Sequence, residues 1–454
     1  MFAELKSKAV FTKAQQYAFE YIDTASERNV YPKEEAIANL QAFDEQMPVE
    51  PTDALKVLEQ LNQTAGPATV AQIYGRYFGF VNGSSLPVAL AAKQLSTFWD
   101  QNVAMYAQSP AAAKLEGVVE RWLQSIFNLP ANTAAGFVSG TSPANICALA
   151  AARYRLFKNQ NWNINENGFA NAPALRIVAG REAHSSVLKS ISLLGFGKKQ
   201  IEFVDTDSEG RIIPGALPPL DNSTLLILQA GNVNSGSFDY FPEICSKAKA
   251  AGAWVHIDGA FGLWAAASQK LKHLTRGIEL ANSWAVDGHK TLNTPYDSGV
   301  VLCADREALT TALQASGDYF IISKERDGMF YTPEMSRRAR IFEIWAALKY
   351  LGLRGLDELI TTMHNRALQF ASEVSTVPGF KVLNEVVFNQ VLVACNTDEK
   401  TVATLKNIQD HRECWVGGSA WHGKKVIRVS VCSWATTEED ISRSVASFKQ
   451  AVES

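Results

Sequence analysis

Four short polar segments, each next to an apolar run, contain the residue types that can perform chemistry. In open α/β sheets, ligands bind at the carboxyl ends of the strands. Residues at strand ends are therefore where we look for a site. The segments are Ser139-Gly140-Thr141-Ser142-Pro143, His184 in GREAHSSVLKS, His256-Ile257-Asp258-Gly259-Ala260 and Asp287-Gly288-His289-Lys290.

The first segment suits a phosphate group. It precedes ANICALAAARYRLF, whose apolar spacing predicts a helix with Ser142 as N-cap and Pro143 as first helical residue. A small, hydroxyl-rich turn at a helix N-terminus offers backbone N–H groups, side-chain donors and the positive end of the helix dipole. An ordinary capped helix has the same residues, so both interpretations stay open.

The other segments supply a base, an acid and an aromatic ring. Burying the charge of a lysine such as Lys290 after a buried strand costs free energy unless the lysine is ion-paired or takes part in a reaction. A desolvated amine is what Schiff-base chemistry requires. Asp258 ends a strand where it can pair with a cationic nitrogen, or it is a turn residue before glycine. His184 can stack on a ring or exchange a proton, although most lone histidines are structural. A surface lysine is the plain alternative for Lys290.

Together, a phosphate turn, a ring-stacking histidine, a carboxylate and a Schiff-base lysine are the protein partners of pyridoxal phosphate. The sequence resembles the group II pyridoxal-phosphate-dependent decarboxylases of the aspartate aminotransferase fold (fold type I), which include aromatic-amino-acid and glutamate decarboxylases. The resemblance covers roughly residues 70 to 445. Its segments are RYFGFVNGSSLP, SPAAAKLEGVVERWL, GFVSGTSPANICALAAAR, REAHSSVLKS, GNVNSGSFD, HIDGAFGLW, SWAVDGHK, PEMSRRARIFEIWAALKYLGLRGL and IRVSVCSWATTEED.

The resemblance implies a role for each matching residue. Lys290 carries the cofactor covalently, Asp258 keeps its pyridine nitrogen protonated, and His184 stacks on its ring. Near the ring, the resemblance implies Ala260 and either Asn232 or Asn234. At the phosphate it implies Gly140, Thr141, Ser142 and His289. On the substrate side it implies Arg428 at the carboxylate and Phe80 in the pocket, where Tyr74, Tyr77 and Phe78 are further candidates. Such aromatic residues are more often core.

The chain departs from the family pattern at several positions. Tyr74-Gly75 replaces the usual His-Pro, Gly288 replaces a proline before His-Lys, and Pro143 replaces a glutamate. The segment 316–332 is shorter than the catalytic loop of the animal aromatic decarboxylases. Tyr331 is the nearest candidate for the loop tyrosine that reprotonates the product, with His184 or a water as alternatives. These departures bear on the identity of the substrate more than on the identity of the cofactor.

The segments that must position these residues predict an α/β protein. Short β-rich runs alternate with helical stretches, which favours a mostly parallel, buried sheet. We expect an N-terminal helical arm (1–65), a large cofactor-binding α/β domain (66–310) and a small C-terminal α+β domain (311–454). The expected strands are 174–180, 200–205, 223–229, 253–258, 283–287 and 298–303, and the expected later helices are 334–352, 355–376, 401–413 and one capped by Thr436 and Glu439.

Composition excludes several classes of protein. With 43 basic and 46 acidic residues, the chain has no electrostatic footprint for nucleic acid or an anionic membrane. No apolar stretch has the length of a membrane span and the first residues do not resemble a signal peptide, so we expect a cytoplasmic protein. The six cysteines are scattered and are expected to be reduced core residues. No zinc motif or nucleotide-binding glycine motif is present, and no metal is expected.

The sequence therefore predicts an enzyme that decarboxylates an L-amino acid to its amine and CO₂. The resemblance also implies a homodimer, with the arm of one subunit packed on the other. The main alternative enzyme is a carbon–carbon lyase of the sphingosine-phosphate lyase or aldolase type; a transaminase ranks third. A catalytically silent pyridoxal-phosphate-binding protein is the non-enzymatic alternative, although binding alone would not require Lys290.

Overall fold

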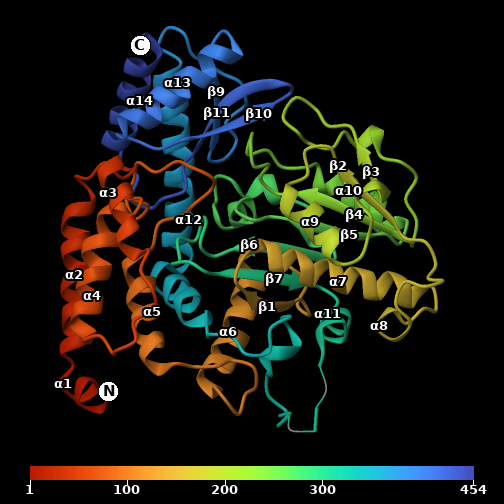
Figure 1. The fold of residues 1–454 in the computed structure, drawn as a ribbon. Helices are drawn as coiled ribbons and strands as arrows, with labels where there is room; N and C mark the ends of the chain where they lie inside the picture. Colours follow the sequence, from red (N-terminus) through yellow and green to blue (C-terminus); the bar gives the residue numbers. More distant parts are fainter. Residues whose placement is uncertain (316, 319) are drawn as a thin grey trace.

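Two β-sheets organise the chain (Figure 1). The computed structural model describes residues 1–315, 317–318 and 320–454. The larger sheet has the order β1-β7-β6-β5-β4-β2-β3, and only β7 runs antiparallel to its neighbours. A mostly parallel sheet, as predicted, is therefore confirmed. Its strands are β1 Ala134–Val138, β2 Arg176–Gly180, β3 Ile201–Val204, β4 Thr224–Gln229, β5 Trp254–Asp258, β6 Ser283–Asp287 and β7 Gly299–Cys303.

Helices bury both faces of this sheet. Every residue of β1, β4, β5, β6 and β7 is buried, which explains the near-continuous apolar runs of these strands. The helix α7 packs across β1, β5, β6 and β7 and also contacts α9 and α11. The helices of this part of the chain are α7 Thr141–Asn159, α8 Ile164–Asn167, α9 Ser185–Leu193, α10 Phe241–Ala250 and α11 Arg306–Leu313. Helices α7, α9 and α11 share the buried cluster on one face of the sheet, and α10 belongs to the cluster on the other face.

One edge strand was not predicted. The β1 sequence, AAGFV, has two alanines and a glycine, which have a low intrinsic preference for strands. Gly136 is needed there because a side chain at this position would collide with the backbone of Tyr331 and the side chain of Val301. Tertiary packing, and not local preference, therefore makes this segment a strand.

The smaller sheet belongs to the C-terminal part of the chain and has the antiparallel order β10-β11-β9-β8. In the view of Figure 1 it lies above the larger sheet, with the long helix α12 running down between it and the N-terminal helices. The two helices predicted on either side of residue 352 meet at Gly352, whose φ of 57° is not helical, so α12 consists of two helical segments. The elements are β8 Lys381–Val382, β9 Gln390–Ala394, β10 Gly417–Trp421, β11 Lys424–Ser430, α12 Ile341–Val374, α13 Asp398–His411 and α14 Glu438–Glu453.

The first 126 residues are mainly helical and lie at the side of the molecule opposite β2 and β3 (Figure 1). Several of their large apolar side chains are exposed, among them Phe19, Leu61, Phe98 and Trp99. Within the described residues, no helix is both long and apolar enough to cross a membrane. The helices are α1 Phe2–Ser7, α2 Ala9–Ala25, α3 Glu34–Ala38, α4 Ala54–Ala65, α5 Pro87–Trp99 and α6 Pro110–Ile126.

Two predicted helix starts were wrong by one or two residues. The helix α7 begins at Thr141 with Gly140 as its N-cap, so Pro143 is its third residue and not its first. Proline is tolerated there because the first N–H groups of a helix have no partner within the helix. The helix α14 is capped by Thr437 with Asp440, because the neighbouring Thr436 hydroxyl instead donates to the buried carbonyl of Gly75.

Candidate active site

A cavity of about 350 Å³ lies where the segments after β1 and β6 meet. It brings together seven of the residues singled out in the sequence: Gly140, Thr141, Ser142, His184, Ala260, His289 and Lys290. The other lining residues are Asn82, Ser139, Pro143, Ser186, Asp287 and Tyr296. The carboxyl ends of parallel strands thus converge here, as ligand sites of open α/β sheets do.

Lys290 follows β6 and is paired with the last residue of that strand. Its Nζ lies 3.0 Å from Oδ2 of Asp287. Asp287 is almost completely buried, and among the described residues its Oδ1 has no hydrogen-bond partner. A buried carboxylate beside the amine compensates the charge that makes a lysine costly at this position.

His289 is fixed as a neutral ring. Its Nδ1 accepts a hydrogen bond of 3.1 Å from the backbone N–H of Ser298, and its Nε2 lies 3.5 Å from Oδ2 of Asp287. The ring centroid is 4.4 Å from that of Tyr296. Burial lowers the pKa of His289, while Asp287 acts in the opposite direction. Since Nδ1 accepts, the proton of the neutral ring is on Nε2, which faces Asp287.

A chain of buried polar groups orients Asp258, at the end of β5. Oδ1 of Asp258 accepts from the Ala260 N–H (3.1 Å), and Oδ2 accepts from Nδ2 of Asn145 (3.4 Å). Oδ1 of Asn145 in turn lies 2.9 Å from Nε2 of His256, whose Nδ1 lies 3.0 Å from the Ser283 hydroxyl. Burial lowers the pKa of His256 to about 3, so the ring is neutral and one nitrogen donates while the other accepts. This chain holds the carboxylate of Asp258 in one orientation.

The turn at the start of α7 has unused donors. The hydroxyl of Thr141 is buried and has no partner among the described residues. The N–H groups of the first helical turn also have no partner within the helix. A Cβ at Gly140 would lie 3.2 Å from the His289 ring, so a side chain there would crowd the cavity wall. The turn is therefore suited to an anion such as a phosphate group.

His184 caps the helix α9 and faces the charged groups of the site. Its Nδ1 lies 2.7 Å from the Ser186 hydroxyl and accepts from the Ser186 N–H at 3.3 Å. Burial is the main cause that lowers the pKa of His184; Asp258 raises it, whereas Lys290 and Arg428 lower it. His184 is thus near three other residues that the sequence singled out.

Asn232 and Asn234 do not line the cavity. Oδ1 of Asn232 accepts from the Asn234 N–H at 2.8 Å, and its Nδ2 donates to the carbonyl of Glu182 at 3.4 Å. Oδ1 of Asn234 accepts from the hydroxyl of Ser419, in β10. In this arrangement the two side chains hold the loop after β4, and Asn234 joins that loop to the smaller sheet.

Arg428 and Phe80 lie on the small-domain side of the site, outside the cavity lining. Arg428, in β11, donates from one terminal nitrogen to the carbonyl of Val233 at 3.3 Å, and its buried Nε has no partner among the described residues. Burial lowers the pKa of Arg428. Phe80 is 59% exposed, has a φ of 55° and stacks on Trp415 with a centroid distance of 5.7 Å.

Tyr331 is also outside the cavity lining of its own chain. Its hydroxyl accepts a hydrogen bond of 3.0 Å from Arg306, and the guanidinium of Arg326 lies 3.8 Å from its ring centroid. Arg326 is itself paired with the buried carboxylates of Glu116 and Glu120. The surroundings of Tyr331 are therefore a buried ion-pair network. Residues 316 and 319 of the predicted loop segment 316–332 are outside the described residues.

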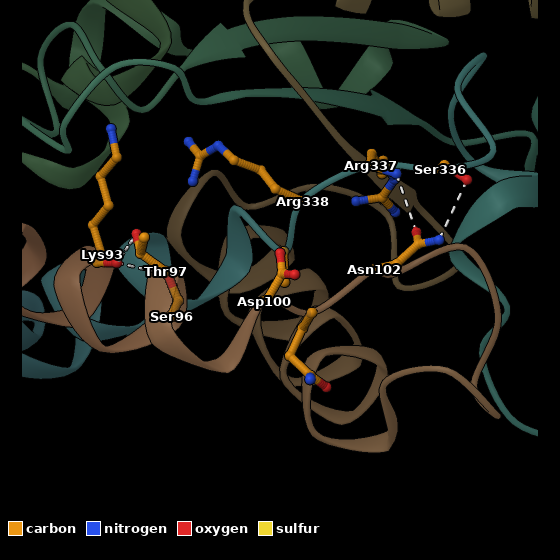
Figure 2. Close-up of a pocket in the computed structure, with 10 residues that line it drawn as sticks. Lys93, Ser96, Thr97, Asp100, Asn102, Ser336, Arg337 and Arg338 are labelled. Atoms are coloured by element: carbon orange, nitrogen blue, oxygen red, sulfur yellow. Dashed lines mark hydrogen bonds between the residues drawn. The ribbon is translucent and has the colours of Figure 1, made fainter. Parts of the chain in front are cut away.

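A second cavity, of about 480 Å³, lies between the end of α5 and residues 336–339 (Figure 2). In Figure 2 the side chain of Lys93 points upward from the helix, and the side chain of Arg338 extends sideways towards it. Lys93 donates to the carbonyl of Tyr296, and Arg338 pairs with Asp297, so this cavity borders the loop that follows Lys290. None of the residues predicted to do chemistry lines it. The smaller cavity around Lys290 is therefore the candidate active site.

Sequence reasoning missed four residues of the site and its surroundings. Asp287 and Asn145 were not assigned roles, and Asn82 and Tyr296 were not singled out. A signal existed for Asn145, because it is a polar residue in the otherwise small and apolar run ANICALAAA, where the buried face of a helix was expected.

Within the described residues, no group of three or more His, Cys, Asp or Glu side chains is placed to hold a metal ion.

Comparison with known proteins gives both sequence and structural relatives. The family described as "pyridoxal-dependent decarboxylase conserved domain" matches residues 37–395. Acidic amino acid decarboxylase GADL1 of Mus musculus is 30% identical over 274 residues, which cover 56% of this chain and 48% of that protein, about half its length. The aromatic-L-amino-acid decarboxylase of Bacillus atrophaeus is 27% identical over 348 residues, covering 74% of this chain and 69% of that protein.

Solved structures match along almost the whole chain. The structure described as Oryza sativa TDC with PLP and tryptamine has a TM-score of 0.89 at 19% identity, covering 99% of this chain and 98% of that chain. The structure of mouse CSAD has a TM-score of 0.88, also at 19% identity, and covers 98% of this chain and 99% of that chain. These likenesses show a shared fold.

Proposed function

The chain belongs to the pyridoxal-dependent decarboxylase family, and we propose that it removes the α-carboxylate of an L-amino acid as CO₂, with pyridoxal phosphate bound covalently at Lys290. The family and the type I fold confirm the resemblance seen in the sequence. Pyridoxal phosphate supplies an electron sink for the electrons of the broken bond. The protein supplies binding, orientation and proton transfer.

The single observation that supports this proposal most strongly is the convergence of Lys290 and the turn at Thr141 at one cavity. Asp258 is outside the lining but accepts from the N–H of Ala260, which is part of the cavity wall. Thr141 has an unused buried hydroxyl where a phosphate would be held. Lys290 lines the same cavity, which has space for a small ring. Asp258 has both oxygens oriented by donors, as a fixed partner for a cationic ring nitrogen requires.

His184 and Arg428 are assigned to the substrate side of the ring. His184 lines the cavity as a neutral imidazole, so it can pack against a ring without adding charge. The buried Nε of Arg428 lacks a partner among the described residues, and Arg428 and His184 are close enough to influence each other. A guanidinium in this place can bind the carboxylate of the substrate in a bidentate manner.

For reprotonation of the product, we favour His184 or a water molecule over Tyr331. The Tyr331 hydroxyl is held by Arg306, outside the cavity lining of its own chain. Any role of Tyr331 would require that this hydrogen bond be broken. His184 already lines the cavity and needs no such rearrangement.

The substrate class is left to experiment, because the relatives named above are called acidic and aromatic amino acid decarboxylases. The purified protein with added pyridoxal phosphate should release CO₂ from at least one L-amino acid of a panel containing both classes, and the matching amine should form. An α-keto acid would instead indicate transamination, and an aldehyde formed from a phosphorylated amino alcohol would indicate a carbon–carbon lyase. Either result without CO₂ release would refute the proposal, as would binding without any reaction.

Attachment of the cofactor has its own test. Borohydride reduction of the loaded protein, followed by peptide mapping, should find the cofactor on Lys290. Lys290→Ala should bind pyridoxal phosphate without the absorbance of the covalent form and should not trap it. Cofactor trapped on another lysine would contradict the assignment.

We also propose that the protein is a cytoplasmic homodimer. The exposed apolar side chains of the N-terminal helices, such as Phe19 and Leu61, form surface that a second subunit would cover. Light scattering at micromolar concentration should give twice the mass of one chain, and a monomer would refute the dimer. Cell fractionation tests the compartment.

A further inference from the structure

The two buried carboxylates near the cavity differ in how their oxygens are used. Both oxygens of Asp258 accept hydrogen bonds from groups that hold it in place. Asp287 uses only Oδ2, which is 3.0 Å from Nζ of Lys290 and 3.5 Å from Nε2 of His289. Its Oδ1 is buried and has no partner among the described residues. Asp287 therefore differs from Asp258, because its carboxylate is not held by hydrogen bonds to both oxygens.

The backbone of Asp287 is anchored without help from its side chain. Its N–H donates to the carbonyl of Ala260 at 2.9 Å, and its carbonyl accepts from Nε1 of Trp264 at 2.8 Å. It also pairs with Gly299 of β7 in the sheet. The carboxylate is thus held beside Lys290 by its backbone, and its side-chain contacts are with Lys290 and His289 of the cavity wall. Burying such a group has a cost, which suggests a use in the chemistry of Lys290.

We propose that Asp287 is the acid–base residue for attaching Lys290 to the cofactor. This inference rests on the proposed function. An ammonium has no lone pair, so Lys290 must lose a proton before its nitrogen can bond to an aldehyde carbon. Oδ2 of Asp287 is at hydrogen-bond distance and receives that proton directly.

The proton and electron balance of this step is complete within the site. The Lys290 nitrogen forms its bond to the aldehyde carbon with its freed electron pair, and the carbon–oxygen bond breaks. The oxygen leaves as water with two of the three ammonium protons, one of them delivered by Asp287, and the third proton stays on the Lys290 nitrogen. Asp287 ends ionised, as it began, and no oxidant or reductant is consumed. Release of Lys290 by the amine of a substrate uses the same transfers in reverse.

Four titratable groups, His289, Tyr296, His184 and Cys432, face the Lys290–Asp287 pair. Burial raises the pKa of Cys432, so its thiol keeps its proton. The two groups that flank Asp287 in its own loop, His289 and Tyr296, do not replace it in this role. His289 directs an N–H toward Oδ2 and its Nδ1 is occupied by Ser298, so it has no free acceptor nitrogen. Tyr296 packs against the other side of His289, and burial raises its pKa, so it too keeps its proton. Among the described residues around Lys290, Asp287 is the acceptor within 3.0 Å of Nζ.

The alternative is that Asp287 is only a counter-ion that restrains the amine, and the two roles predict opposite effects. If Asp287 accepts the proton, its removal slows attachment, because Lys290 then lacks the acceptor at hydrogen-bond distance. If Asp287 only restrains the amine, its removal frees the amine and accelerates attachment.

The experiment measures how fast pyridoxal phosphate attaches to cofactor-free protein, by stopped-flow absorbance, so no turnover is needed. In Asp287→Asn the rate should fall about 100-fold near pH 7. A variant rate equal to or above that of the wild type would overturn the proposal.

A matched control and a rescue separate this role from a structural one. Asp297→Asn makes the same change in an ion-paired aspartate of the neighbouring loop, where Asp297 pairs with Arg338 and Arg340 and not with Lys290. Its attachment rate should match that of the wild type. In Asp287→Ala, added formate should take the place of the missing carboxylate and raise the attachment rate at least tenfold. If the variant has wild-type circular dichroism and formate does not raise the rate, the result counts against the proposal.

Failure of this inference and failure of the proposed function give different results. If wild-type protein traps no cofactor on Lys290 after borohydride reduction, the proposed function fails. If the wild type traps cofactor on Lys290 but Asp287→Asn attaches it as fast, only the role of Asp287 fails.

Discussion

Replacing Asn145 by leucine tests whether the buried chain behind Asp258 supports function. Asn145 is fully buried and bridges Nε2 of His256, at 2.9 Å, and Oδ2 of Asp258, at 3.4 Å. Leucine has a similar size but cannot bond either group. Each buried polar group left without a partner costs about 1–3 kcal/mol, so Asn145→Leu should lower the free energy of unfolding by about 2–4 kcal/mol.

The same substitution should reduce catalysis more than cofactor binding. Without Asn145, only the Ala260 N–H orients the carboxylate of Asp258, so its pairing with the ring nitrogen weakens. The rate of CO₂ release at saturating substrate should fall by about tenfold, the effect of about 1.4 kcal/mol. The Kd for pyridoxal phosphate should change little because the turn at Thr141 is untouched.

Urea denaturation and CO₂ release, measured on the same preparations, check both expectations. Asn165→Leu is a matched control, because Asn165 is exposed at the molecular surface. Among the described residues, its side chain donates one hydrogen bond, to the carbonyl of Thr311. This control should change the free energy of unfolding by less than about 1 kcal/mol. If Asn145→Leu has the stability and the turnover of the control, the buried chain has no role in orienting Asp258.

Three further predictions concern the roles assigned above. Asp258→Asn should retain pyridoxal phosphate but lower turnover by orders of magnitude, because the ring nitrogen loses its anionic partner; steady-state kinetics and cofactor absorbance check this, and unchanged turnover would remove the role. Arg428→Ala should raise KM for the amino acid at least tenfold, about 1.4 kcal/mol, with less effect on the Kd of the cofactor; a change confined to cofactor binding would contradict it. Because the pKa of His256 is about 3 in the folded protein and 6.5 for a histidine free of such burial, the unfolded chain binds an extra proton between these values. The free energy of unfolding should therefore fall by about 1.4 kcal/mol per pH unit below about pH 6.5, and His256→Gln, measured by denaturation at several pH values, should lack this contribution; equal slopes in both proteins would refute it.

Local patterns were sufficient to predict the elements of the large sheet that have strong apolar runs. STLLILQ and SWAVD are each flanked by polar or turn residues, and the structure has β4 and β6 in these segments. The same reasoning failed for β1, whose alanines and glycine have no strand preference of their own. It also misplaced the cap of α14, because Thr436 and Thr437 are equivalent in sequence and only the contact of Thr436 with Gly75 distinguishes them.

For the candidate site, the sequence determined which residue types follow the strands, and the family resemblance named their roles. It did not determine that Asn145 and His256 support Asp258, or that Asp287 faces Lys290. These contacts join residues from α7, β5 and β6 that are as much as 113 positions apart in the chain. Side-chain direction at a strand end depends on the neighbouring strands and on the helix packed above them. The sheet order, which no local pattern contains, therefore decided which of the two carboxylates is held by Asn145 and which faces the lysine.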